Sequence, residues 1–245
     1  MPLKNFIGFL VIIFIFSTNA EAKKSAFVPF QKMYGWKLCK TKGFRCEIIS
    51  KAIGWKKFWP DDREREIIMK LNRLNIKLLL PGMPVAIPEN MAGKTLADWS
   101  PFPKKTESPG EKFFLFDPGL LAWAAYDKNG NLVRWGPALG GNDYCRDIHR
   151  QCRTIVGDNF RVGIKGNANS RSGAYPIGCG GKNKPCAPMP WVMYFYKHYY
   201  GIHGSNKMIG WNASHGCVRT FNDDAEWLHK NFIEIGTRVI VKPYL

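Results

Sequence analysis

The stretch "IHGSNKMIGWNASHGCVR", residues 202–219, places a cysteine among glycines and histidines. A thiol at its ordinary pKa is only slightly ionised at neutral pH, so a nucleophilic cysteine needs a nearby imidazole or cation. His203 and His215 supply imidazoles, and Arg219 supplies a cation two residues after Cys217. The stretch therefore predicts a cysteine nucleophile with a histidine base.

Two histidines compete for the role of base to Cys217. His203 follows an aromatic stretch and reaches the cysteine if the chain folds back through residues 204–213, whereas His215 is separated from it by one residue. We prefer His203 and keep His215 as the alternative. Gly216 permits a tight turn in which backbone N–H groups converge on a developing oxyanion.

Arg219 is the candidate for binding substrate, because a guanidinium holds a carboxylate through two parallel hydrogen bonds. Less specific interpretations stay open. In one, the cysteine is an inert buried thiol and the histidines are structural. In another, the segment binds zinc, although the spacings match no familiar structural site, and the ligands would be His198, His203, His215 and Cys217.

The N-terminus has the pattern of a signal peptide over residues 1–22. Lys4 precedes an apolar run at residues 6–16, and small residues stand at Ala20 and Ala22. The run is well short of the roughly 20 residues that a membrane-spanning helix needs. We therefore expect secretion across the inner membrane to the periplasm or cell envelope, with no transmembrane span.

Six of the seven cysteines fall into three pairs with equal spacing, and Cys217 is left over. In an oxidising compartment an even set favours disulfides, and a leftover cysteine favours a free thiol. Other connectivities and unpaired buried thiols remain alternatives. The preferred disulfides join Cys39 with Cys46, Cys145 with Cys152, and Cys179 with Cys186.

Positive charge is concentrated near the start of the mature chain. The formal net charge is +17, and residues 23–60 carry ten Lys and Arg side chains against Glu47 alone. In an exported protein such a region suits anionic envelope polymers, or serves only as a solvated face. We expect no nucleic-acid partner.

The composition changes after residue 98. Residues 99–111 hold three prolines and a glycine without apolar periodicity, which is typical of a linker. The predicted organisation is a signal peptide (1–22), a basic N-terminal region (23–98), this linker (99–111) and a larger domain (112–245).

The basic region contains a helix, a turn and a strand in succession. Residues 62–74 have apolar side chains at helical spacing after an acidic start, and "PVAIP" at 84–88 favours a short strand after a proline-glycine turn. This order, over about residues 60–90, resembles a LysM-type glycan-binding module, although the usual opening strand is not recognisable. A small α+β packing unit without sugar binding is the alternative.

The larger domain is rich in strand patterns. "DKNGN" at 127–131 is a hairpin signal between two apolar runs. Residues 159–165, 191–203 and 237–244 each favour a strand through alternation, aromatic content or β-branched residues.

One amphipathic helix is expected over residues 222–236, with Asn222 as its cap and Gly236 at its end. The predicted fold class is accordingly mostly β with a few short helices, preceded by a small α+β LysM-like unit.

"IHG" at 202–204 followed by "SHGCVR" at 214–219 resembles the active-site signature of the L,D-transpeptidase catalytic domain, also called the YkuD-type domain. The likeness extends over about residues 112–245, through the opening hairpin, the next strand and the closing helix and strand. One departure is "TIVG" at 154–157, where the family usually has a TP-x-G turn.

The resemblance implies a role for each motif residue. Cys217 is similar to the acylated nucleophile, His203 to the general base that forms a thiolate–imidazolium pair, and the Gly204 carbonyl to the group that orients the imidazole. The shell around the oxyanion would comprise Ser214, His215 and Gly216.

Substrate contacts are also expected from the resemblance. Arg219 matches the motif arginine, and Trp211 lies in the loop where a mobile lid is expected. Tyr194 and Tyr196 are candidates for lining the groove, with core packing as the equal alternative.

The implied reaction is acyl transfer on peptidoglycan stem peptides, without metal or organic cofactor. Cys217 would attack the carbonyl before the terminal D-Ala of a tetrapeptide stem, release D-Ala and hold a thioester that an amine resolves. A diaminopimelate acceptor gives a 3-3 cross-link, a lipoprotein lysine gives an anchor, and water gives L,D-carboxypeptidase activity. A carbapenem is expected to target the same thiol. A non-catalytic cell-wall-binding or adhesion protein remains the alternative.

Overall fold

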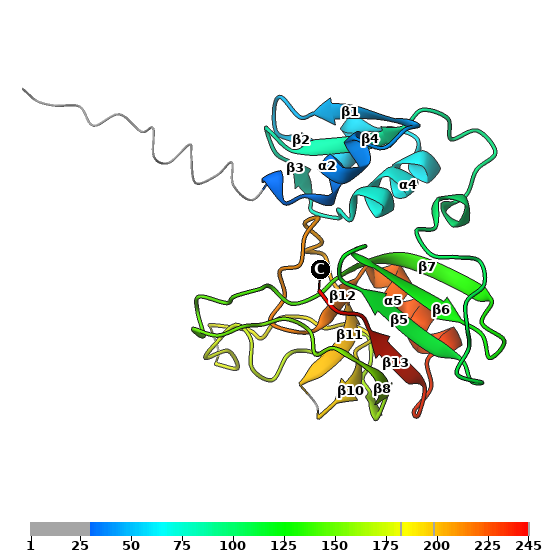
Figure 1. The fold of residues 1–245 in the computed structure, drawn as a ribbon. Coiled ribbons are helices and arrows are strands. Elements are labelled where there is room, and N and C mark those ends of the chain that lie inside the picture. Colours follow the sequence, from blue (N-terminus) through cyan, green and yellow to red (C-terminus); the bar gives the residue numbers. More distant parts are fainter. Residues whose placement is uncertain (1–29, 182, 198, 245) are drawn as a thin grey trace, which may run out of the picture.

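The computed structural model describes residues 30–181, 183–197 and 199–244. The predicted signal peptide, residues 1–22, and His198 lie outside these ranges. Within the described residues, no helix is both long enough and apolar enough to cross a membrane. Figure 1 shows a small N-terminal unit, residues 30–88 in blue to cyan, beside a larger β-rich part.

The N-terminal unit mixes short helices and strands, as its sequence predicts. β1 pairs antiparallel with β4, and β2 pairs antiparallel with β3. The strand predicted at residues 84–88 is present as β4, whereas the LysM resemblance stays a prediction. The elements are α2 (Tyr34–Cys39), β1 (Phe44–Ile48), β2 (Ile53–Gly54), α3 (Trp55–Phe58), α4 (Asp62–Asn72), β3 (Leu78–Leu79) and β4 (Pro84–Pro88).

Helix α4 ends two residues earlier than its apolar pattern predicts. Its start is capped by the Asp61 side chain, which accepts a hydrogen bond from the Glu64 backbone N–H at 2.7 Å. Arg73 then adopts a left-handed conformation with φ of 60°, which stops the helix. Leu74 leaves the helix fully buried and forms a β-bridge with Ile209.

The larger part is built on one nine-stranded sheet with the order β8-β13-β5-β6-β7-β12-β11-β10-β9. Its pairs are antiparallel except for β11 with β12 and β13 with β5, which are parallel. The predicted hairpin around residues 127–131 is present as β6 and β7. The strands are β5 (Phe113–Asp117), β6 (Ala122–Tyr126), β7 (Leu132–Leu139), β8 (Gly157–Arg161), β9 (Ile164–Lys165), β10 (Met193–Tyr196), β11 (Tyr200–Gly204), β12 (Val218–Thr220) and β13 (Arg238–Val241).

The middle of this sheet is buried on both faces. Phe113 and Leu115 belong to the core shared with the N-terminal unit, whereas Phe114 and Phe116 belong to the core that includes Leu228. Alternate residues of β5 thus supply two different cores, which explains why this strand is apolar at almost every position. The N-terminal unit is therefore packed on the sheet that carries the site.

The segment predicted as a linker, residues 99–111, lies along the β6–β7 hairpin. Thr106 donates its backbone N–H to the Gly130 carbonyl at 2.9 Å, and Tyr126 donates its hydroxyl to the Pro103 carbonyl at 2.9 Å. It begins where the short 3₁₀ helix η1 (Leu96–Trp99) ends. This proline-rich segment therefore has an irregular backbone but is hydrogen-bonded to the hairpin.

Three expectations about secondary structure need correction. The single helix expected over residues 222–236 is α5 (Asn222–Trp227) followed by the π-turn η2 (Leu228–Phe232), and Phe221 holds the N-cap position instead of Asn222. Residues 159–165 are divided between β8 and β9, and residues 191–203 form the hairpin of β10 and β11. β8 pairs with β13 and β9 pairs with β10, so the first run is divided between the two ends of the strand order, whereas β10 and β11 are neighbours.

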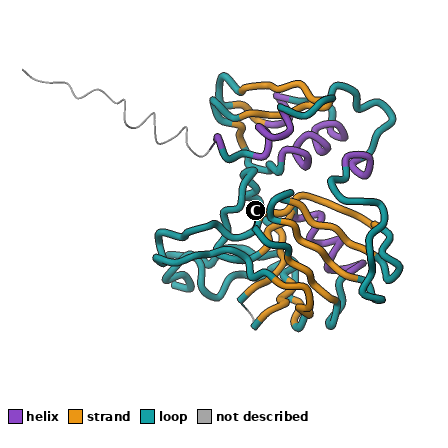
Figure 2. Tube along the Cα trace, in the orientation of Figure 1, coloured by secondary structure: helices purple, strands orange, loops and turns teal. Residues whose placement is uncertain are grey.

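Long loops gather at one side of the sheet, beyond its central strands, where Figure 2 shows several teal segments side by side. Two of these loops carry disulfides, which join Cys145 with Cys152 and Cys179 with Cys186. The third joins Cys39 with Cys46 in the N-terminal unit, and Cys217 is a free cysteine. All three preferred pairings are therefore present in the structure.

Candidate active site

The two motif segments lie beside each other in the sheet. β11 and β12 pair in parallel, with Ile202 opposite Val218 and His203 opposite Arg219. Cys217 directly precedes β12, and residues two apart on an extended chain point to the same face. The pairing thus brings His203, Cys217 and Arg219 to one cavity, which all three line.

His203 is buried, with 6% of its surface exposed, and its ring is held by its neighbour in the chain. The ring Nδ1 lies 2.8 Å from the Gly204 carbonyl oxygen. Because a carbonyl only accepts hydrogen bonds, Nδ1 carries the proton and Nε2 keeps a lone pair. The imidazole is therefore in the tautomer that a general base requires.

The His203 imidazole and the Cys217 thiol are both shifted toward their neutral forms. Burial lowers the pKa of His203 to about 4; the Gly204 carbonyl opposes the shift and the Arg219 guanidinium adds to it. Burial raises the pKa of the Cys217 thiol, while the Gly201 backbone N–H and Arg219 act in the opposite direction. These shifts favour a neutral thiol and imidazole over a thiolate–imidazolium pair.

Ser214 and Gly216 shape the turn before the cysteine. The Ser214 hydroxyl donates to the Cys217 carbonyl at 2.5 Å and accepts from the Gly216 backbone N–H at 3.0 Å. Gly216 has φ of 123°, and a Cβ at this position would lie 2.8 Å from the Tyr200 ring. The turn therefore requires glycine, and the Gly216 N–H is engaged by Ser214.

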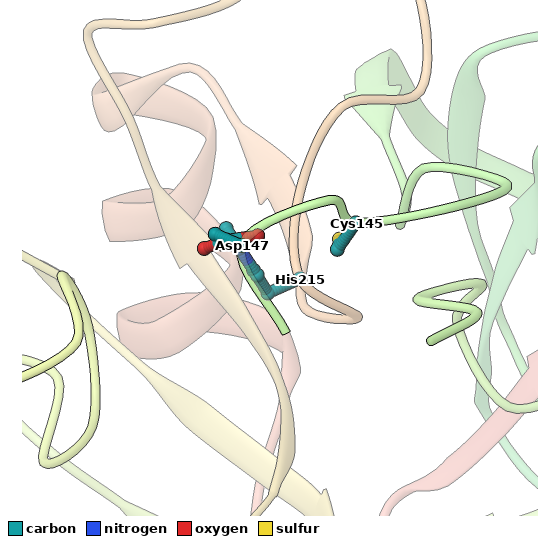
Figure 3. Close-up of side chains that lie close together, drawn as sticks. All are labelled: Cys145, Asp147 and His215. Carbon is teal, nitrogen blue, oxygen red and sulfur yellow. Dashed lines mark hydrogen bonds and ion pairs between the residues drawn. The ribbon is translucent and has the colours of Figure 1, made fainter. Parts of the chain in front are cut away.

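His215 is held by a different set of partners from His203. Its Nε2 lies 2.8 Å from an Asp147 carboxylate oxygen, and its ring stacks on Tyr175 with centroids 4.2 Å apart. Figure 3 shows Asp147 beside His215, on the same loop as Cys145. These three side chains would suit a metal only if Cys145 offered its sulfur, which is instead bonded to Cys152.

The cavity at the site has a volume of about 460 Å³ and is bounded by three walls. One wall comes from residues 172–175 and 187–190, which flank the disulfide-bonded loop. A second wall is Ser205, Asn206 and Lys207, which follow β11. The third includes His215 and Ser214, and Cys217, His203 and Arg219 line the cavity as well.

The aromatic candidates do not all reach this cavity. Tyr194 lines it, and burial raises the pKa of its phenol, with a smaller contribution from Cys217. Tyr196 instead packs against Phe160 and Tyr200. Trp211 packs against the core of the N-terminal unit and lines a separate cavity.

Sequence reasoning did not single out Asp147, Tyr175, Tyr199 or Lys207. Tyr199 and Lys207 line the cavity, and the Cys217 sulfur lies 3.6 Å from the Tyr199 carbonyl oxygen. Asp147 and Tyr175 lie in or beside the disulfide-bonded loops. The regular cysteine spacing was the available signal that these loops are fixed in place.

Residues 118–241 match the sequence profile of the YkuD family, described as the L,D-transpeptidase catalytic domain. The chain is similar to a probable L,D-transpeptidase, YbiS, of Escherichia coli K12, with 33% identity over 89 residues. That alignment spans 36% of this chain and 29% of the relative.

A solved L,D-transpeptidase structure is similar to this chain over a larger part of its length. The crystal structure of the L,D-transpeptidase (residues 123–326) from Xylanimonas cellulosilytica aligns with a TM-score of 0.50 and 26% sequence identity. The alignment covers 66% of this chain and 73% of that one. The mostly β fold with few short helices is therefore shared with that protein.

Proposed function

This chain belongs to the L,D-transpeptidase catalytic domain (YkuD) family, and on that premise we propose that it transfers peptidoglycan stem peptides through a thioester on Cys217. The observation that carries the assignment of residues is the parallel register that sets His203 opposite Arg219, two residues after Cys217. The Nδ1 contact with the Gly204 carbonyl leaves Nε2 of His203 as the proton acceptor.

Acylation begins with the neutral thiol. The Cys217 sulfur attacks the carbonyl carbon between the third, L-configured residue of a tetrapeptide stem and D-Ala, while its proton moves to Nε2 of His203. The peptide C–N bond then breaks, and the imidazolium returns the proton to the departing D-Ala amine. The products of this half-reaction are a thioester and free D-Ala.

Deacylation follows the same proton path in reverse. An acceptor amine attacks the thioester carbonyl and loses a proton to His203, which returns it to the sulfur as the C–S bond breaks. An acceptor side chain of diaminopimelate gives a 3-3 cross-link, a protein amine gives an anchor, and water gives carboxypeptidase activity. Each outcome leaves the free thiol ready for another cycle.

Arg219 and Lys207 both line the cavity and supply positive charge to it. Burial lowers the pKa of Arg219, and Cys217 acts in the opposite direction, but a guanidinium stays protonated at neutral pH. We assign Arg219 to a carboxylate of the stem peptide, because a guanidinium holds a carboxylate with fixed geometry.

The test is intact-mass spectrometry of the oxidised protein after exposure to a carbapenem, with the Cys217→Ala variant as the matched control. One covalent adduct on the native protein and none on the variant support a reactive thiol at this position. An adduct that persists in the variant would reject Cys217. Digestion of tetrapeptide muropeptides with the native protein then identifies the acceptor from the products.

A second cavity supports a role of the N-terminal unit in holding anionic envelope glycans. Its volume is about 570 Å³, and it lies between α2 and the turn before β6. Trp36 and Trp211 line it, together with three exposed lysines: Lys32, Lys37 and Lys40. Flat indole faces and nearby ammonium groups suit a sugar polymer that bears phosphate or carboxylate groups.

Binding of the full-length chain to purified sacculi at low and high salt tests this second role. Charge attraction is screened over about 8 Å at physiological ionic strength, so high salt should release most of the protein. Reversal of Lys32, Lys37 and Lys40 to Glu should weaken binding. The same change at Lys104, Lys105 and Lys128, which are exposed away from the cavity, is the matched control. Salt-resistant binding would instead favour a LysM-type groove.

The compartment proposed for this activity is the periplasm or cell envelope. Three disulfides are present within the described residues, and such bonds persist in oxidising compartments. Fractionation of expressing cells, with detection of the mature chain, checks the assignment.

A further inference from the structure

One wall of the cavity is tied to the N-terminal unit. Ser205, Asn206 and Lys207 follow β11 and line the cavity, and residues 208–210 continue directly from them. Figure 1 shows the orange segment between β11 and β12 extending to the underside of the N-terminal unit. We call Ser205, Asn206 and Lys207 the β11 wall.

Asn75, just beyond α4, makes the most direct connection to the β11 wall. Its side-chain Nδ2 donates to the Ser205 carbonyl at 2.6 Å, and its Oδ1 accepts from the Met208 backbone N–H at 2.8 Å. Its backbone N–H donates to the Met208 carbonyl at 3.1 Å. Asn75 thus binds the backbone both before and after Lys207.

Backbone contacts extend this connection beyond Asn75. Gly210 donates its N–H to the Arg73 carbonyl at 3.1 Å and accepts from the Tyr34 N–H at 2.8 Å. Leu74 forms a β-bridge with Ile209. The chain after the β11 wall is therefore held by two separate parts of the N-terminal unit.

The segment that carries Asn75 is itself rigidly placed. The buried Arg73 guanidinium donates from Nη1 to the Lys70 and Leu71 carbonyls at 3.0 and 2.9 Å, and from Nη2 to the Leu120 carbonyl at 3.1 Å. Met208 is fully buried in a cluster that contains Tyr34. Hydrogen bonds and apolar packing therefore both fix the contact.

We propose that Asn75 is a positioning residue for substrate binding: it holds the β11 wall in place, so the N-terminal unit completes the stem-peptide cavity. The proposal rests on the proposed function. In this role Asn75 does not contact the reacting atoms, and it acts only by fixing the position of the β11 wall. The geometry thereby makes the N-terminal unit part of the catalytic architecture in addition to any role in surface attachment.

Steady-state D-Ala release from soluble tetrapeptide muropeptides tests the proposal in the full-length chain. Asn75→Ala should raise KM about tenfold with little change in kcat, because the wall binds the ground state and transition state alike. Asn75→Asp keeps an acceptor for the Met208 N–H and loses the donor to Ser205, so its KM should be intermediate. Asn90→Ala, at an exposed turn, is the matched control.

Two further measurements separate positioning from general destabilisation. Hydrogen–deuterium exchange of Asn75→Ala should rise at Met208 and its neighbours while the sheet strands keep native protection. The rate of Cys217 alkylation by iodoacetamide should stay within about twofold of native, since this small reagent does not need the wall. Faster exchange throughout the sheet would indicate a purely structural role and overturn the proposal.

A double-mutant cycle with Lys207→Ala gives an independent test. If Asn75 acts through the β11 wall, Lys207→Ala should raise KM. Asn75→Asp should then raise KM by a smaller factor in the Lys207→Ala background than in the native chain. Two results would contradict the proposal. One is that the two substitutions change KM independently of each other, and the other is that neither single variant changes KM. If the native chain releases no D-Ala, the proposed function fails, while hydrogen exchange still reports whether Asn75 holds the wall.

Discussion

His203 and Arg219 are direct partners across the parallel pair of β11 and β12. Burial lowers the pKa of His203 to about 4, and the adjacent guanidinium adds to this shift while the Gly204 carbonyl opposes it. At neutral pH the imidazole is therefore uncharged and able to accept a proton. Since burial also raises the pKa of Cys217, the mechanism proposed above has the proton leave the sulfur during attack on the substrate.

This relationship predicts the acid limb of the pH profile. D-Ala release, measured as kcat/KM, should be nearly constant from about pH 5.5 to 7 and fall about tenfold per pH unit below about pH 4, because protonated His203 cannot accept a proton. Arg219→Gln should move the limb to higher pH, since a like charge is removed. An acid limb of the native enzyme near pH 6.5 would contradict this account.

The two motif histidines should differ in their effect on acylation. His203→Ala should slow single-turnover acylation by about a thousandfold, because the proton acceptor is lost. His215→Ala should cost about tenfold, since His215 is held by Asp147 and Tyr175 at the cavity wall. Rapid-quench measurement of D-Ala gives both rates, and a larger loss in His215→Ala would reverse the assignment of the base.

The buried ion cluster between α4 and α5 should be a major contributor to stability. Lys70 lies 2.6 Å from an Asp223 oxygen and 3.0 Å from an Asp224 oxygen, and Asp224 also binds Arg134 at 2.8 Å. Burial alone would lower the pKa of Lys70, but Asp224, Asp223 and Glu66 outweigh it and raise that pKa.

Lys70→Met should therefore lower the free energy of unfolding by about 3 kcal/mol, because it leaves the buried Asp224 carboxylate short of a partner. Lys230→Met, which removes an exposed ion pair with Glu226, is the control and should change stability by less than about 1 kcal/mol. Urea denaturation measures both. Equal effects would show that the cluster is not stabilising.

The oxidised protein should contain one titratable thiol. After denaturation without reductant, a thiol reagent should label Cys217 alone, since the other six cysteines are bonded in the structure. Peptide mapping identifies the labelled residue and the bridges. Finding Cys217 in a disulfide of the active form would refute both the pairing and its role.

The parts of the fold with clear local signals were predictable from the sequence. The hairpin at residues 127–131 follows from its turn residues, and the strand at 84–88 from its apolar run after a proline-glycine turn. The helix after residue 222 was harder, because its pattern continues across η2, where the hydrogen bonding changes. Local patterns do not encode such a change.

The site was predictable where it depends on chain neighbours and not where it depends on tertiary packing. His203 and Gly204 are adjacent, so their contact follows from a motif. The contact of Asn75 with Ser205 joins residues 130 positions apart, and Lys70 looks like an exposed helical lysine until α5 covers it. Trp211 likewise packs on the N-terminal unit, a contact that its place in the loop between His203 and Cys217 does not predict.

The most direct test of the central claim is D-Ala release from a purified tetrapeptide muropeptide by the native chain and by Cys217→Ala, with circular dichroism confirming that both are folded. The native chain should release D-Ala and carry a thioester mass on its Cys217-containing peptide, and the variant should show no release above background. Appreciable D-Ala release by Cys217→Ala would contradict the assignment of the nucleophile.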